Sequence, residues 1–147
     1  MDERVTHLKT PEECEQFVRN VQGRLPELAL QARQRAVELR AASAAVRRGV
    51  TTAVEREALA AVYAYEAVKS LRGRKFTASR TWQMIDRHGI IEAVERTVCR
   101  TKETAGYEAL MAAGMEMFAF EAVVLRYPNV FSSEAVAQST KRLKSRT

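Results

Sequence analysis

Helix start and stop signals recur along nearly the whole chain and leave little sequence between them. Thr10 and Thr52 are each followed three residues later by a glutamate, which is the capping-box pattern of a helix N-terminus. Pro11 and Pro26 suit the first position of a helix, where the missing N–H costs no hydrogen bond. We find no alternating β pattern longer than four residues. The sequence therefore predicts an all-α fold.

The spacing of apolar residues predicts about six to seven helices. A chain of 147 residues is long enough to bury a core of its own, so we expect one compact multi-helix domain over 1–140 and a basic, frayed C-terminal tail over 141–147. The helices are expected near residues 10–23, 26–48, 52–72, 78–88, 90–99, 107–127 with a kink at Gly114, and from 132 onward. The segments 78–88 and 90–99 form a short helix–Gly–helix pair.

Cysteine use and apolar runs indicate a soluble cytoplasmic protein. Cys14 and Cys99 are too far apart in sequence for a metal motif and too few for a disulfide framework, so we expect two reduced thiols. The opening residues are charged, unlike a secretory signal. The most apolar run, 109–125, is interrupted by Glu116 and Glu121 and is too short to span a bilayer. The Ala/Arg-rich composition is typical of a bacterial protein.

Patterns typical of enzymes are missing from the sequence. His7 and His88 have no partner at metal-ligand spacing, so no metal is expected. There is no Gly-rich phosphate loop, nucleophile elbow or paired-carboxylate signature. We therefore predict no cofactor and favour a non-enzymatic role, although the sequence leaves an enzyme built around Glu121 and a nearby arginine open.

Glu121 shares the apolar stripe of its helix, where a carboxylate must be paired or neutralised. We expect a structural ion pair with an arginine of a neighbouring helix, either Arg80 or Arg96. The alternative is that Glu121 faces a groove and takes part in a functional site.

Positive charge is concentrated in the middle of the chain. Residues 47–100 hold eleven basic and six acidic side chains, whereas residues 1–46 are neutral. No acidic residue interrupts 69–80, where five basic side chains precede or begin a helix. Lysine and arginine beside a helix N-terminus are what contacts to a nucleic-acid backbone require. The segment is therefore a candidate polyanion-binding surface.

We predict a small nucleic-acid-binding protein that contacts mainly phosphates, with DNA preferred to RNA, as an accessory or regulatory subunit of a nucleic-acid-handling system. Trp82 either supports the site or stacks on a base. The predicted contact residues are Lys69, Arg72, Arg74, Lys75, Ser79, Arg80, Trp82, Gln83, Arg87 and, on the tail, Lys141, Arg142 and Lys144. The alternative for this segment is a solvated basic surface with Phe76 and Trp82 in the core.

The helix–Gly–helix pair resembles a DNA-binding helix–turn–helix in outline. Its second helix, however, is expected to expose Glu92 and Glu95, which repel phosphate. We therefore place the contact on the first helix and on the loop and helix mouth before it, and treat the second helix as a poor base reader.

A second class of function follows from the segment 107–125. Met111, Met115, Met117, Phe118 and Phe120 direct apolar side chains nearly all round the expected helix. Such a helix lies in the core or is covered by another subunit. The alternative function is thus a protein–protein adaptor or oligomeric regulatory subunit.

Overall fold

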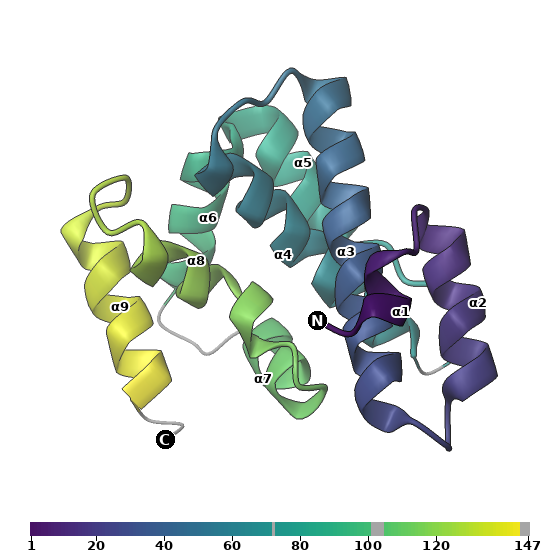
Figure 1. Ribbon diagram of the computed structural model, residues 1–147. Coiled ribbons are helices and arrows are strands. Elements are labelled where there is room, and N and C mark those ends of the chain that lie inside the picture. The colour runs from purple at the N-terminus through teal and green to yellow at the C-terminus, as the bar shows by residue number, and fades with distance from the viewer. Residues whose placement is uncertain (72, 101–104, 145–147) are drawn as a thin grey trace.

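The structure confirms the predicted all-α fold. The computed structural model describes residues 1–71, 73–100 and 105–144, which contain helices and no strand. In chain order these are α1 (Glu3–Thr6), α2 (Pro11–Val21), α3 (Pro26–Arg48), α4 (Ala53–Ser70), α5 (Ser79–His88), α6 (Ile90–Val98), α7 (Ala105–Ala112), the 3-10 helix η1 (Glu116–Phe118), α8 (Phe120–Arg126) and α9 (Ser133–Lys144) (Figure 1). None of the helices in these ranges is both long and apolar enough to cross a bilayer.

The predicted caps form as expected. The Thr10 hydroxyl accepts the backbone N–H of Glu13 at 3.1 Å, and the Thr52 hydroxyl accepts that of Glu55 at 3.3 Å. These bonds satisfy donors that the first turn of a helix leaves free. The short helix α1, capped by the Asp2 side chain, was not predicted.

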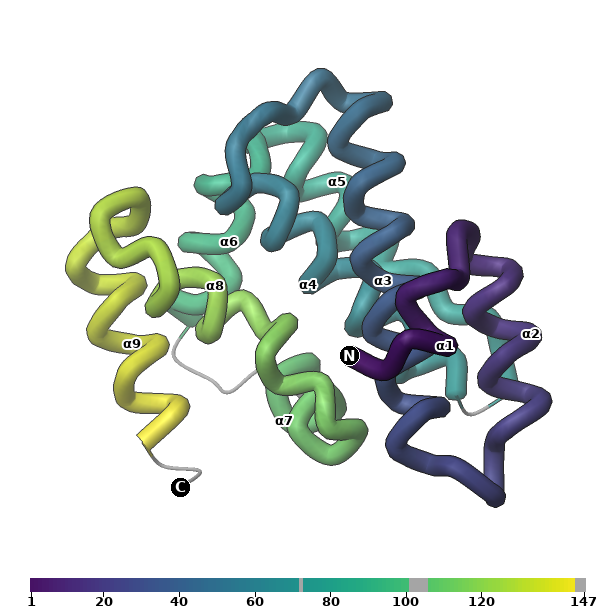
Figure 2. Tube along the Cα trace, in the orientation of Figure 1, coloured from purple at the N-terminus to yellow at the C-terminus, as the bar shows by residue number. Residues whose placement is uncertain are grey.

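Two apolar clusters hold the helices together. A small cluster, with Val5, Val21 and Leu28 at its centre, joins α1, α2 and the start of α3 at one end of the molecule. A larger cluster includes side chains from α3 to α9, with Leu59 of α4 fully buried. The tube in Figure 2 shows α1 and α2 on one side of α3, with α9 on the far side of the molecule. The long helices α3 and α4 therefore form the frame on which the C-terminal helices pack.

The single helix predicted over 107–127 is wrong, because the chain breaks at Gly114. This glycine has φ +74°, and the Met115 N–H bonds back to the Leu110 carbonyl at 2.8 Å, which closes α7. A left-handed backbone of this kind ends a helix and favours glycine. The chain then passes through η1 before α8 begins, and this path buries Met115 and Phe118.

The first residues of the predicted basic tail, Lys141 to Lys144, form the end of the packed helix α9. α9 extends through Lys144, so the predicted domain boundary at residue 140 falls inside it. Ser139 and Arg142 are buried, which ties the last turns of α9 to the body of the protein. Residues 145–147 lie outside the described residues.

Candidate nucleic-acid interface

The helix–Gly–helix pair is present, with each helix one residue shorter at its outer end than predicted. Gly89 alone joins α5 to α6, with φ +89° and ψ 163°. Ile85, Ile90 and Val94 are buried and fix the pair to the main core. The two helices lie side by side in Figures 1 and 2. They thus present a shared outer surface between them.

An arginine-rich groove of about 500 Å³ runs between these helices, and we call it the arginine groove. Its lining residues are Arg80, Gln83, Met84, Arg87, His88, Arg96 and Arg100. The members from α5 recur at intervals of three and four residues, which places them on one helix face. Arg96 and Arg100 are likewise four residues apart. None of the described lining residues carries a carboxylate.

Most of the charge in this groove has no carboxylate partner among the residues that the structure describes. Of the residues that the structure describes, Arg80, Arg87 and Arg100 form no ion pair, and all three are exposed. Arg96 Nη2 lies 3.6 Å from one oxygen of the Glu92 carboxylate, and His88 Nδ1 lies 3.5 Å from the other. Elsewhere arginines do pair with acids: Arg40 with Glu15, Arg48 with Asp86, and Arg126 with Glu57. Like charges that gather in a concave surface raise the local concentration of anions.

Glu95 does not face the arginine groove. Its carboxylate accepts the backbone N–H of Ser132 at 2.5 Å, just before α9 begins. Glu95 thus helps to hold the start of α9, and Glu92 alone of these two acids borders the groove. Only Glu92 is therefore placed to repel phosphate from the groove, whereas both acids were expected to do so.

The other predicted contacts from the middle of the chain that the structure describes do not line the groove. Arg74, Lys75 and Ser79 are exposed along the loop that leads into α5 and at its first residue. The Lys69 ammonium lies 5.9 Å and 5.7 Å from the ring centres of Tyr65 and Phe76, so part of its surface is covered by aromatic rings. Arg72 lies outside the described residues.

The predicted phosphate site at the start of α5 already holds a carboxylate. Glu66 Oε2 accepts the Ala78 N–H and the Trp82 indole N–H, both at 2.8 Å. A second anion there would be repelled by Glu66. Trp82 also packs against the Tyr63 ring. The central carbon of the Arg48 guanidinium lies over the Trp82 ring, 5.2 Å from its centre. Trp82 therefore supports α5, and its contacts favour this role over stacking on a base.

Replacing Trp82 with Phe is expected to lower the free energy of unfolding by about 1.5 kcal/mol, because Glu66 loses a charge-assisted hydrogen bond. Urea denaturation measures this change. Tyr63→Phe is the matched control, since it keeps the packed ring and removes a 3.5 Å contact to Arg47. Equal effects of the two substitutions would contradict the role assigned to the indole N–H.

Glu121 forms the predicted structural ion pair, but with neither predicted partner. Its Oε2 lies 2.8 Å from Nη1 of Arg142 on α9, and both side chains are less than a tenth exposed. Arg142 Nη2 also donates to the carbonyl of Arg100 at 2.5 Å. Arg142 therefore fixes the backbone of a groove arginine and is too enclosed to contact phosphate. Of the other predicted tail contacts, Lys141 and Lys144 are exposed on α9.

The remaining reactive groups do not suggest chemistry at this surface. Cys14 and Cys99 are free thiols, and burial raises the pKa of each, which lowers their reactivity. Within the described ranges, no group of three or more His, Cys, Asp or Glu side chains could hold a metal ion. Comparisons with protein families, with curated proteins and with solved structures gave no match to this chain.

Proposed function

We propose that this protein binds nucleic acid by its phosphate backbone, with the arginine groove as the principal contact. The observation that carries the proposal is the gathering of four arginines along one groove, three of them without an ion pair among the described residues. Guanidinium groups match phosphate in geometry and remain charged at any physiological pH. A surface on which the described residues leave this much positive charge unpaired is suited to an anionic partner.

The extent of the groove favours a polymer over a single phosphate. Arg80 and Arg87 lie seven residues apart on α5, about 10 Å along the helix axis. The positive charge is thus spread along the groove and matches successive phosphates of a strand. Arg74 and Lys75, on the loop before α5, extend the basic surface beyond the groove.

Backbone contact is favoured over base reading. Four of the seven lining side chains are arginines, and Glu92 at the rim is poorly placed for approach to a phosphate-lined major groove. We therefore expect weak dependence on sequence and strong dependence on salt. An accessory role needs no catalytic group.

The test is a fluorescence anisotropy titration of a labelled DNA duplex of random sequence. Engagement of four phosphates predicts a loss of affinity on the order of 100-fold between 50 and 200 mM salt, because each neutralised phosphate releases counterions. A single-stranded oligonucleotide of the same length serves as a second probe. Failure to bind either probe at 50 mM salt would refute the proposal.

The alternative adaptor function finds less support in the structure. Met115 and Phe118 are buried within the chain itself, and Met111 and Phe120 are half-buried. Met117, at 53% exposed, is the one member of this set that presents a large apolar surface. The segment 107–125 is thus mainly used in the protein's own core.

A further inference from the structure

A second pocket adjoins the arginine groove and extends into the apolar interior; we call it the inner pocket. It has a volume of about 460 Å³ and lies where α4 to α8 meet. Arg80, Met84 and Arg100 line both the inner pocket and the arginine groove. Two arginines therefore lie where a cationic surface meets a mainly apolar pocket.

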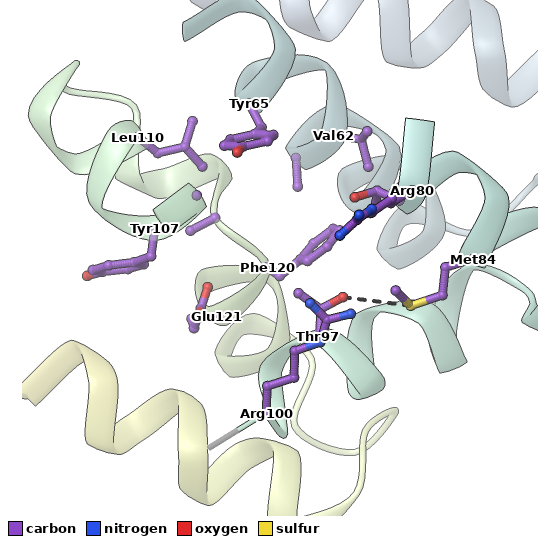
Figure 3. A pocket seen from close by; sticks show the side chains of 14 residues that line it. Val62, Tyr65, Arg80, Met84, Thr97, Arg100, Tyr107, Leu110, Phe120 and Glu121 are labelled. Atoms are coloured by element: carbon purple, nitrogen blue, oxygen red, sulfur yellow. Dashed lines mark hydrogen bonds between the residues drawn. The ribbon is translucent and has the colours of Figure 1, made fainter. Parts of the chain in front are cut away.

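The walls of the inner pocket are aromatic and aliphatic. Tyr65 and Phe120 contribute rings, while Val62 and Leu110 contribute aliphatic surface; the Tyr107 ring points away from these side chains in Figure 3. Figure 3 shows the Arg80 side chain entering from α5 and the Arg100 side chain from the segment after α6, with the Phe120 ring beside Arg80 in this view. The volume falls within the range of about 300–1,000 Å³ that small-molecule sites occupy, and a mainly apolar lining with a few polar groups is typical of them.

The charged side chains that line the pocket differ in sign. Arg80 and Arg100 attract an anion at the mouth. Glu121 lines the pocket as well, and its charge is already paired with Arg142. A second anionic group near Glu121 would meet a carboxylate, so the pocket favours a ligand with one anionic group and an otherwise uncharged body.

We propose that the inner pocket binds a small aromatic compound with a single anionic group, and that this ligand displaces nucleic acid by occupying Arg80 and Arg100. The aromatic body lies against Tyr65 and Phe120, and the anionic group lies at the two arginines. Displacement rests on the proposed function, whereas binding of the small anion does not. The protein would then release its polyanion in response to an aromatic acid.

The probe is 1-naphthoate, with the uncharged 1-naphthamide and the doubly charged 2,6-naphthalenedicarboxylate as comparisons, each titrated by isothermal calorimetry. We expect 1-naphthoate to bind at least tenfold more tightly than either comparison compound. Arg80→Gln combined with Arg100→Gln should remove this preference over the amide. Absence of naphthoate binding, or equal binding of all three compounds, would overturn the proposal.

Two further variants separate the pocket from the groove. Thr81 lines the inner pocket alone, so Thr81→Phe should block naphthoate and preserve binding of the duplex. Arg87 and Arg96 line the groove alone, so Arg87→Gln with Arg96→Gln should weaken the duplex and preserve naphthoate. Circular dichroism and a thermal melt check that each variant folds. Loss of naphthoate from the groove variant, with retention by Thr81→Phe, would place the ligand outside the inner pocket.

Displacement is measured by adding 1-naphthoate to the duplex complex at fixed ionic strength. We expect release from the wild type and none from Thr81→Phe. Failure of the wild type to bind duplex would refute the proposed function and the displacement together, while the calorimetric result would still decide whether the pocket binds an aromatic anion.

Discussion

Arg142→Met is expected to lower the free energy of unfolding by about 3–5 kcal/mol, because it leaves the buried carboxylate of Glu121 without its cation. The substitution also removes the donor to the Arg100 carbonyl. Methionine fills much of the same volume, so the loss should come from the uncompensated charge. Urea denaturation, followed by far-ultraviolet circular dichroism, measures the change.

Lys141→Met is the control for this experiment. It removes a positive charge from the same turn of α9 at an exposed position, and it should change stability by no more than about 0.5 kcal/mol. Combining Glu121→Leu with Arg142→Met should recover much of the loss, since an apolar pair leaves no buried charge. A double variant no more stable than Arg142→Met alone would contradict the assigned role of the ion pair.

Arg87→Gln combined with Arg96→Gln is expected to weaken binding of a DNA duplex on the order of 100-fold at 100 mM salt. Hydrogen bonds to charged groups contribute about 1.5–3 kcal/mol each, and a factor of ten in affinity corresponds to about 1.4 kcal/mol. Both side chains are exposed, so the fold should tolerate the change. Anisotropy titration of the labelled duplex measures the loss.

The matched control is Arg19→Gln combined with Arg24→Gln. Both arginines are exposed, on α2 and in the turn after it, at the end of the molecule away from α6 (Figure 1). This pair lowers the net charge by the same amount as the groove pair. If the two pairs weaken binding equally, the contact depends on overall charge and the arginine groove has no special part in it.

Most helix boundaries could be predicted because their signals are local. The Thr10 and Thr52 caps and the Gly49 and Gly89 helix ends lie within a few residues of the bonds that they make. The break at Gly114 could not be predicted in this way, because the apolar pattern continues across it. A Cβ at Gly114 would lie 3.2 Å from Leu30 of α3, so the packing there involves a residue far away in sequence.

The site was predictable where it depends on one helix. The spacing of Arg80, Gln83 and Arg87 places them on one face of α5, and all three line the groove. Arg96 and Arg100 were missed as contacts, although their four-residue spacing was visible, because Glu92 and Glu95 made α6 look unsuitable. The burial of Glu121 followed from its helix stripe, whereas its partner Arg142 lies 21 residues later on another helix.

The salt dependence of duplex binding distinguishes contact through the groove from general attraction by charge. The slope of log Kobs against log salt should be about −3.6 for the wild type if all four groove arginines engage phosphates, since each contact contributes about −0.9. Arg87→Gln with Arg96→Gln should reduce its magnitude by about 1.8, while Arg19→Gln with Arg24→Gln should leave it unchanged. The same slope for the wild type and the groove variant would show that these arginines do not contact the phosphates.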